Sequence, residues 1–498
     1  MSMERGRDVV RAGERLVSWG QGMGLLVLAL AVRLWNLGGQ SLWVDEVLQF
    51  NISREPLWRL VQAVAGGADN SPPVYHTVLH YVIAAGGTSE WALRLPSALF
   101  GSTSVVLIYI IARQLGQTRG APLAGLLLAL SPLHVWYSQE ARMYSLMVML
   151  VLGQTVVLLR ALRHPSWSAW SAYCLLTIVA LYTYPYVLLS CLGQGCWLAL
   201  GQQRRQQALK PWLLATGVAG LSFVPWVLTL LHREDLTAGL EKAVSPAVAL
   251  GYTALTFIAG YNIGPSVAEL HVNRGVSALL PHWPYLAAYG LLGAAGLGAT
   301  VWHWRRERCS LSLAACMVLW PVLGVLAVSE VMPSITYNVR YALAAVPFLC
   351  LGFGVGLGSL RSGPRVVLVI GFIALSGLSL WRGQTLPQYL REDNRAAAAY
   401  VAQAGQPGEL VLLQASVPFK HYFQRQDILL QAIPRGLSKE ERVSLAQRLA
   451  REHPSLWLVE CRSWTVDASG VMEKTLRQAL SVESRMEFAG VRVTHYRR

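Results

Sequence analysis

Residues 121–162 have the sequence APLAGLLLALSPLHVWYSQEARMYSLMVMLVLGQTVVLLRAL, in which two apolar runs flank a short polar segment. A helix needs roughly 20 mainly apolar residues to cross the hydrocarbon core of a bilayer. The runs at 121–137 and 143–162 approach that length and carry almost no charge before their ends. This stretch therefore predicts two membrane-spanning helices with polar side chains between them at one membrane face.

Similar apolar runs recur along most of the chain. Hydrophobic residues make up 54% of the 498 residues and charged residues only 14%, whereas soluble domains carry about 25% charged residues. We predict an all-α, multi-pass membrane bundle of about eleven transmembrane helices, of which the first is a retained span and not a cleaved signal peptide. The expected spans are 21–38, 92–115, 121–137, 143–162, 168–184, 185–202, 211–232, 283–305, 309–330, 339–360 and 364–382.

The basic residues predict the orientation of this bundle. The net charge is +15, but no dense basic cluster with interleaved aromatic residues is present, so we expect no nucleic-acid partner. Instead, arginine and lysine recur in every second connection, as cytoplasmic segments require. We therefore predict a protein of the cytoplasmic (inner) membrane whose N-terminus is in the cytoplasm. Residues 39–91 and 233–282 and the C-terminal domain would then lie on the outer side of this membrane. The predicted inside residues are Arg5, Arg7, Arg11, Arg15, Arg113, Arg119, Arg160, Arg163, Arg204, Arg205, Lys210, Arg305, Arg306, Arg308, Arg361 and Arg365.

Two segments outside the spans have patterns of their own. The outer segment 39–91 contains helical patches at Leu57–Val64 and Tyr75–Ile83, which fit amphipathic helices lying on the membrane surface. After residue 387 the pattern changes to short strand-like runs that alternate with helices. We predict a transmembrane domain at 1–387 and a small soluble α/β domain at 388–498. Its predicted strands are Leu410–Leu413, Ile428–Leu430, Leu456–Val459 and Val491–Thr494, and its predicted helices are Lys439–Arg451 and Val471–Leu480.

A pair of adjacent acids, Asp45 and Glu46, follows the first span at the predicted outer face. Adjacent residues do not share one face of a helix or strand, so one acid can meet a substrate while the other holds structure. A solvated pair, or two acids in the first turn of a helix, is the alternative without a catalytic role.

A second group of polar residues lies between the two spans quoted above. Tyr137, Glu140 and Tyr144 would share one face if this segment were helical, because they are three and seven residues apart. An acid and an arginine at the membrane boundary are costly unless they pair or line a wet cavity. The sequence leaves three roles open for Arg142: an ion pair with Glu140, contact with a ligand phosphate, or snorkelling to the interface.

A third group lies at the outer end of the predicted span 339–360, and a pair of histidines lies in the first predicted outer segment. Arg340, next to Tyr341, is a candidate for a phosphate because guanidinium is always charged and forks onto phosphate oxygens. Interfacial anchoring is the alternative. His76 and His80 have the spacing of a metal pair on a helix, although a polar helix face is the interpretation we favour, because no third ligand is evident.

Together these segments resemble the polytopic transferases that use dolichyl- or polyprenyl-phosphate sugars, among them protein O-mannosyltransferases and the aminoarabinose lipid A transferase. The resemblance covers residues 30 to about 350. It rests on the order and topology of several motifs, none of which is specific alone. These are Trp43-Val44-Asp45-Glu46, Ser71-Pro72-Pro73-Val74-Tyr75, Arg94-Leu95-Pro96-Ser97-Ala98-Leu99-Phe100-Gly101, Ser131 to Tyr144, and Asn338-Val339-Arg340-Tyr341.

The resemblance implies an active site with Asp45 as the base and Glu46 and Glu140 as supporting acids. Arg142 and Arg340 are the candidate ligands of the donor phosphate. The candidate substrate contacts are Tyr137, Tyr144, His76 and Tyr341. Many bacterial relatives have histidine where this chain has Ser71, so a metal or substrate contact made by that histidine is in doubt here. The sequence identifies no cofactor and leaves a divalent metal open.

The predicted reaction is the inverting transfer of a sugar from a polyprenyl-phosphate donor to a lipid, glycan or protein acceptor at the outer membrane face. One displacement by a hydroxyl that Asp45 deprotonates would invert the anomeric carbon, whereas retention would need a separate nucleophile. The alternatives are an oligosaccharide transferase, which would favour a pyrophosphate donor and a metal, and a flippase for lipid-linked sugars. A flippase predicts ionisable residues at the bilayer midplane and symmetric halves, and neither is evident.

Overall fold

The computed structural model describes residues 2–231, 245–266, 269–270, 276–306, 308–332, 335–414, 416–434 and 436–498. Much of the predicted outer segment 233–282 lies outside these residues, as do the side chains of Arg5, Arg7, Arg11 and Arg15. The chain forms two compact units. The helical unit comprises Met1–Leu37, Gln49–Tyr261 and Pro284–Leu380, and the sheet unit comprises Gly38–Leu48, Asn262–Trp283 and Trp381–Arg498.

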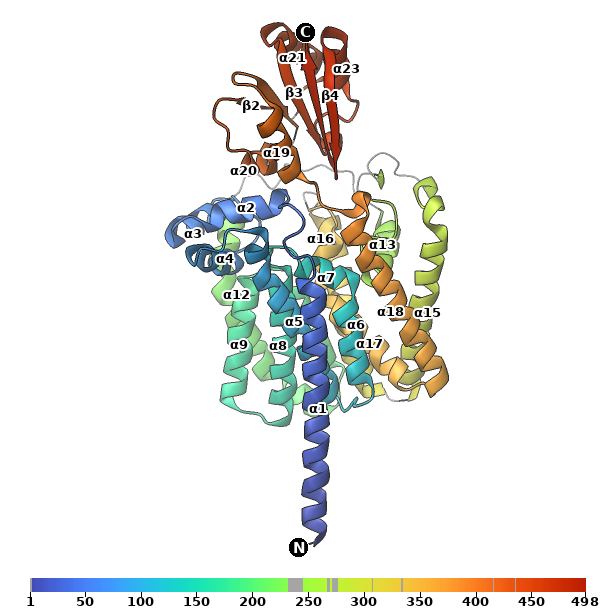
Figure 1. Ribbon diagram of the computed structural model, residues 1–498. Helices are drawn as coiled ribbons and strands as arrows, with labels where there is room; N and C mark the ends of the chain where they lie inside the picture. Colours follow the sequence, from blue (N-terminus) through green and yellow to red (C-terminus); the bar gives the residue numbers. More distant parts are fainter. Residues whose placement is uncertain are drawn as a thin grey trace. The chain divides into compact units, whose positions relative to one another are not determined.

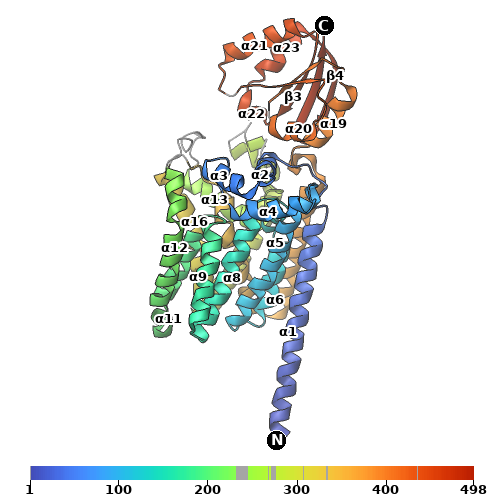
Figure 2. The same ribbon diagram turned by 90° about the vertical axis from the view of Figure 1, so that its left-hand side faces the viewer.

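Long, apolar helices build the helical unit. They are α1 (Ser2–Leu34), α5 (Glu90–Gln114), α8 (Tyr144–Arg163), α12 (Leu209–Leu231), α15 (Trp283–Arg306), α16 (Arg308–Val331) and α18 (Ser362–Thr385). Shorter elements lie between them: α6 (Gly120–Leu130), α7 (Pro132–Ser138), α9 (Trp167–Leu181), α10 (Val187–Ala199), α11 (Gln203–Gln207), α13 (Pro246–Ala259), η4 (Val339–Ala345) and α17 (Val346–Gly358). Helix α5 packs against α1, α6 and α8, and α9 packs between α8 and α12 (Figures 1 and 2).

The predicted count of eleven spans is not confirmed by the described residues. Within the described residues, 8 helices are long and apolar enough to cross a membrane, or 9 if the bent pair α6 and α7 is one span. The predicted spans 168–184 and 185–202 correspond to α9 and α10, which have 15 and 13 residues. Pro185 lies between them and shortens both helices, because proline cannot continue the hydrogen-bond ladder. The polytopic helical bundle is confirmed, but the count of eleven is not.

The predicted span 121–137 forms two helices that are bent by 58° at Ser131. Pro132, the first residue of α7, supplies no N–H to the carbonyls at the end of α6. The buried Arg33 side chain fills this gap, since its Nη1 donates to the Ala129 carbonyl at 3.1 Å and its Nη2 to the Leu128 carbonyl at 3.3 Å. Nη2 also lies 2.9 Å from Nδ1 of His134. Arg33 thus supports the break that positions the segment after α7.

Replacing Arg33 with methionine is expected to lower the free energy of unfolding by roughly 3 kcal/mol, because the freed carbonyls of α6 lose their donors inside the membrane. Thermal unfolding of the purified protein in detergent measures this effect. Arg160→Met, at an exposed position near the end of α8, is the control and should leave stability nearly unchanged. Equal melting temperatures for Arg33→Met and the wild type would contradict the role of Arg33.

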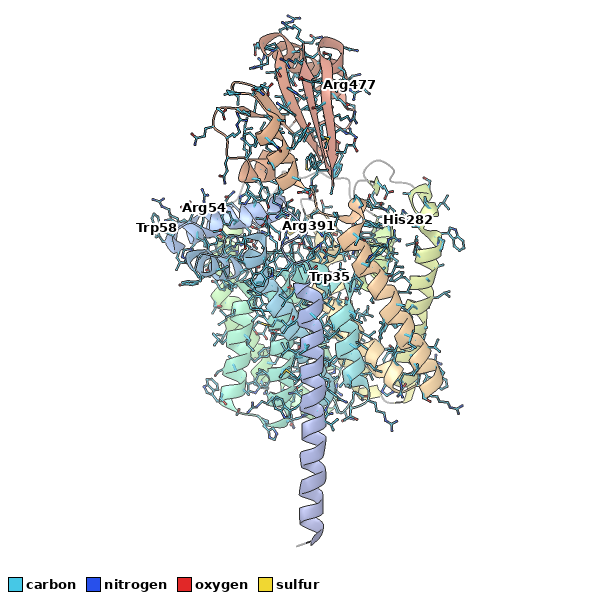
Figure 3. All side chains as sticks on the ribbon, viewed as in Figure 1. Trp35, Arg54, Trp58, His282, Arg391 and Arg477 are labelled. Carbon is cyan, nitrogen blue, oxygen red and sulfur yellow. The ribbon has the colours of Figure 1, made fainter. Side chains whose placement is uncertain are left out.

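Three helices form the first outer segment: α2 (Val44–Ser53), α3 (Leu57–Ala65) and α4 (Val74–Ala84). The predicted patches at Leu57–Val64 and Tyr75–Ile83 are confirmed as α3 and α4 within one residue. Helix α3 buries Leu60 and Val64, while the Trp58 side chain is 60% exposed at the periphery of the helical unit (Figure 3). An apolar side chain exposed in this way fits a helix that lies on a membrane surface.

The sheet unit contains a five-stranded sheet in the order β2-β1-β3-β5-β4. Its strands are β1 (Leu410–Leu413), β2 (Leu429–Ala432), β3 (Ser455–Cys461), β4 (Ser481–Phe488) and β5 (Val491–Arg497), and its principal helices are α19 (Asn394–Ala404), α20 (Ser416–Tyr422), α21 (Lys439–Glu452) and α23 (Val471–Ala479). Strands β2, β1 and β3 are parallel, and β5 is antiparallel to β3 and β4. Helices α19 and α20 cover one face, and α21 and α23 the other. The predicted strands and helices are all present, whereas β4 was not predicted.

Candidate active site

The segment between α7 and α8 is buried although it is polar. Glu140 is 1% exposed, and Gln139 donates from Nε2 to the Trp35 carbonyl at 2.8 Å, which caps the end of α1. Because α7 ends at Ser138 and α8 begins at Tyr144, the segment is not one continuous helix, and the condition under which Tyr137, Glu140 and Tyr144 would share one helical face is not met. The break instead turns the backbone of 139–143 into the interior, where Arg142 finds its partners.

Arg142 forms a two-pronged ion pair with Asp69, a residue of the connection between α3 and α4. Its Nη1 donates to Oδ2 of Asp69, and its Nη2 donates to Oδ1 at 3.2 Å. Nη1 also donates to Oε1 of Gln49 at 2.8 Å. Both charged side chains are only 7% exposed.

Asp69 accepts further hydrogen bonds from Ser71, whose backbone N–H and hydroxyl lie 2.9 and 3.1 Å from Oδ1. Burial alone would raise the pKa of Asp69, but the charge of Arg142 and the hydrogen bonds from His76 and Arg142 outweigh it. The pKa of this carboxyl is therefore held far below its usual range. Asp69 is an anion that fixes the Arg142 fork in place.

The two histidines of α4 have different partners. Nε2 of His76 lies 3.5 Å from Oδ2 of Asp69, while Nδ1 of His80 lies 3.0 Å from the Ser53 carbonyl. The favoured interpretation, a polar helix face, fits this arrangement better than a metal pair. In the part of the chain that the structure describes, no group of three or more His, Cys, Asp or Glu side chains could hold a metal. Asp69 and His76 alone do not fit a divalent cation, because Arg142 already engages both oxygens of Asp69.

Six tyrosines from separate parts of the chain form a second group, which we call the tyrosine cluster: Tyr137, Tyr144, Tyr184, Tyr186, Tyr261 and Tyr341. The ring of Tyr144 lies edge-on to Tyr137 at 4.8 Å and to Tyr184 at 5.7 Å. Tyr186 stacks on Tyr341 at 4.8 Å. Hydroxyl groups join the cluster as well, since those of Tyr137 and Tyr261 are 2.8 Å apart.

Arg340 brings a positive charge to the tyrosine cluster. Its guanidinium carbon lies 5.8 Å from the ring centre of Tyr144 and 5.5 Å from that of Tyr341. The Asn338 side chain accepts from the Arg340 backbone N–H at 3.1 Å, which fixes the start of η4. A guanidinium held against aromatic faces keeps its N–H groups at the edge, in the plane in which a phosphate is bound.

Asp45 and Glu46 belong to the sheet unit and lie in the first turn of α2. Glu46 is buried, and both of its oxygens lie 3.3 Å from Nη1 of Arg391. Asp45 is half-buried. Burial alone would lower the pKa of Arg462, but Glu392 and Asp45 raise it. The neighbouring acids thus have different roles in the structure. Glu46 forms a buried ion pair with Arg391, whereas Asp45 acts electrostatically on Arg462.

The predicted site residues therefore fall into three groups. Tyr137, Tyr144, Arg340 and Tyr341 meet in the tyrosine cluster. His76 and Arg142 meet at Asp69, with Glu140 two residues from Arg142, whereas Asp45 and Glu46 lie in the sheet unit. Sequence reasoning missed Asp69, Gln49, Tyr184, Tyr186 and Tyr261. Two signals were available: Asp69 comes directly before the Ser71-Pro72-Pro73 segment, and three tyrosines surround Pro185 at 182–186.

The chain resembles known proteins in part of its sequence and in its fold. Residues 70–228 match the family described as dolichyl-phosphate-mannose-protein mannosyltransferase. No curated protein matches the sequence significantly. Among solved structures, ArnT from Cupriavidus metallidurans in the apo state is similar over 96% of this chain and 98% of that chain, with a TM-score of 0.57 and 15% identity.

Two further structures show the same fold. ArnT from Cupriavidus metallidurans bound to undecaprenyl phosphate has a TM-score of 0.51 at 16% identity, over 96% of this chain and 98% of that chain. The archaeal oligosaccharyltransferase AglB from Archaeoglobus fulgidus, in complex with an inhibitory peptide and a dolichol-phosphate, has a TM-score of 0.51 at 10% identity, over 95% of this chain and 74% of that chain.

The comparisons thus show a likeness to one class, the membrane glycosyltransferases that use lipid-phosphate sugars: part of the sequence matches the mannosyltransferase family, and the fold is similar to those of ArnT and AglB. The resemblance predicted from the sequence is thereby confirmed. Within that class, this chain is similar in fold to ArnT over nearly its whole length, and residues 70–228 carry the sequence pattern of the mannosyltransferase family.

Proposed function

We propose that this protein transfers a monosaccharide from a polyprenyl-phosphate donor to a lipid, glycan or protein acceptor at the outer face of the cytoplasmic membrane, with inversion of the anomeric carbon. The observation that supports it most directly is the similarity of nearly the whole chain to ArnT, which has also been solved with undecaprenyl phosphate. In this proposal, residues 1–387 form the transferase domain and residues 388–498 an extracytoplasmic domain.

The chemistry needs one base and cations at the phosphate. The acceptor hydroxyl attacks the anomeric carbon and gives its proton to the Asp45 carboxylate, while the bond from that carbon to the phosphate oxygen breaks. Polyprenyl phosphate leaves with a second pKa near 6, so it needs no strong general acid. Arg340 and Arg142 bind the phosphate as its charge develops. Glu46 and Glu140 support the site, and Tyr137, Tyr144, His76 and Tyr341 contact the substrate.

The basic residues at the ends of the helices support the proposed orientation of the bundle in the membrane. Arg160 and Arg163 end α8, Arg119 directly precedes α6, and Arg361 directly precedes α18. The segment after α7 lies at the opposite end of α6. By the positive-inside rule, the arginine-bearing end would be cytoplasmic, and Glu140 and Arg142 would then be at the outer face, as the proposal requires.

A labelled product tests the stereochemistry and the donor together. We expect transfer from a polyprenyl-monophosphate hexose, and we expect the product to have the opposite anomeric configuration, because a single displacement inverts the carbon that is attacked. The coupling constant of the anomeric proton in the NMR spectrum of the purified product gives the configuration. Retention of the donor configuration would exclude a single displacement with Asp45 as its base.

Transfer of a whole oligosaccharide is the second candidate, and the similarity to AglB favours it. It predicts activity with a lipid-pyrophosphate oligosaccharide and loss of activity with a chelator. Comparing both donors with and without EDTA separates the two reactions. If neither donor gives a product and the protein in liposomes moves labelled lipid between leaflets, the flippase interpretation replaces both.

A further inference from the structure

An open hollow lies at the end of the helical unit where α6 and α18 begin. It has about 1040 Å³ of space between its lining atoms, including the solvent at its mouth. The lining residues come from α1, from the residues before and within α6, and from those before and within α18: Gln21, Thr118, Arg119, Pro122, Leu360, Arg361, Ser362 and Arg365. We call it the basic hollow. It lies at the other end of α6 from the segment with Glu140 and Arg142.

The charges around the basic hollow are all positive. Three of its eight lining residues are arginines, and none is an acid. Among the side chains that the structure describes, Arg119, Arg361 and Arg365 form no ion pair with an acid. The N-terminal ends of α6 and α18 add their partial positive charge to the same place. Three guanidinium groups with no described acid paired to them are complementary to an anion.

Close packing of backbones fixes the two sides of the hollow together. A Cβ atom on Gly120 would lie 2.7 Å from Cα of Val355, and one on Gly358 would lie 3.0 Å from Cα of Gly120. The start of α6 is therefore locked against the end of α17, directly before Arg361. Arg119 and Arg361 are held side by side by the fold.

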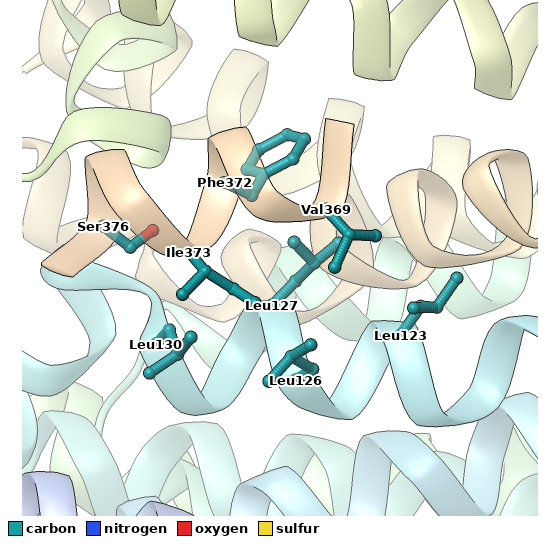
Figure 4. Close-up of a pocket in the computed structure, with 8 residues that line it drawn as sticks. All are labelled: Leu123, Leu126, Leu127, Leu130, Val369, Phe372, Ile373 and Ser376. Carbon is teal, nitrogen blue, oxygen red and sulfur yellow. The ribbon is translucent and has the colours of Figure 1, made fainter. Parts of the chain in front are cut away.

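An apolar groove continues from the basic hollow between the same two helices. Four leucines of α6 and four residues of α18 line it (Figure 4), namely Leu123, Leu126, Leu127, Leu130, Val369, Phe372, Ile373 and Ser376. Its space is about 260 Å³ when the open solvent at its mouth is included. On α6 it begins one residue after Pro122, and on α18 about one turn after Arg365.

The geometry points to a binding site for an anionic membrane phospholipid, with the headgroup phosphate in the basic hollow and one acyl chain in the apolar groove. Basic pockets between helices on the cytoplasmic side are suited to acidic headgroups. The groove separates this ligand from a free phosphate, which would use the hollow alone. The position at the predicted cytoplasmic end separates it from the sugar donor, which the proposed function places at the opposite face. The inference does not depend on the transferase activity.

Thermal unfolding of the purified full-length protein in detergent tests this site with defined lipids. We expect dioleoyl phosphatidylglycerol to raise the melting temperature of the wild type, and dioleoyl phosphatidylcholine not to do so. The variant R119Q/R361Q/R365Q should need roughly 100-fold more phosphatidylglycerol for the same shift, since each arginine near a membrane surface contributes about fivefold. The control R160Q/R163Q/R305Q removes three arginines from other predicted cytoplasmic positions and should respond as the wild type does.

The other probes decide between the sources of the phosphate. Dihexanoyl phosphatidylglycerol and inorganic phosphate should give little shift, because neither fills the groove. An equal shift with inorganic phosphate would overturn the lipid assignment in favour of a free anion, and a larger shift with undecaprenyl phosphate would overturn it in favour of a polyprenyl lipid. Equal responses of the two triple variants would exclude the site. If R119Q/R361Q/R365Q does not fold, Arg361→Gln alone, at an exposed position, should weaken the response about fivefold.

Discussion

Asp45→Asn is expected to reduce the rate of sugar transfer by between about 10²- and 10⁴-fold, the range that a general base contributes. Asparagine is nearly the same size but does not accept a proton, so the attacking hydroxyl must lose its proton to water. Donor binding should change little, because the proposed ligands of the donor phosphate are Arg142 and Arg340 and do not include Asp45. The measurement is single-turnover transfer from a radiolabelled polyprenyl-phosphate hexose to extracted membrane acceptors, alongside a donor-binding assay.

Two matched variants make this result specific. Glu55→Gln removes an acid from the same outer segment, where its side chain is 40% exposed, and should transfer at the wild-type rate. Glu46→Gln removes the partner of Arg391 and should lower the melting temperature more than Asp45→Asn does. Normal transfer by Asp45→Asn would make Asp45 structural and leave Glu46 or Glu140 as the candidate base.

Local patterns predicted most of the elements well. The apolar runs and the alternating strands reproduce the helices of the bundle and four of the five strands, because burial on one face leaves a period in the sequence. Strand β4 was missed, since Ser481–Phe488 is mostly exposed and lacks that alternation. The span at 121–137 was predicted as one helix, because hydropathy does not show that Pro132 lacks the backbone N–H that a continuous helix needs. The two halves are bent by 58°.

The candidate site was predicted in its residue types but not in its pairings. Arg142 was expected to meet Glu140 or a phosphate, whereas its carboxylate partner is Asp69, 73 residues away. Spacing along a helix reveals partners three or four residues apart, and contacts between distant segments leave no such period. The tyrosine cluster was not predicted for the same reason: its members come from five separate segments, and only the fold brings them together.

Asp69→Asn is expected to lower the free energy of unfolding by about 3–5 kcal/mol, because it removes a carboxylate that forms a buried, two-pronged ion pair with the Arg142 guanidinium. Since the pKa of Asp69 is held below its ordinary value, its contribution to stability is complete above about pH 4. It is lost as the pH falls toward the lower, folded-state pKa. The stability difference between wild type and Asp69→Asn should thus stay constant between about pH 5 and 8 and shrink in stronger acid. A difference that varies across the neutral range would contradict this.

The effect on activity should pass through Arg142. Arg142→Lys keeps the charge but loses the fork that spans both oxygens of Asp69, so we expect the KM for the donor to rise about tenfold or more while kcat changes less. Asp69→Asn should raise the same KM, and the double variant with Arg142→Gln should be no worse than Arg142→Gln alone, since Asp69 acts by holding Arg142. A double-mutant cycle on stability and on KM measures this coupling. Additive effects in both would mean that Asp69 and Arg142 act separately and that Arg340 alone binds the phosphate.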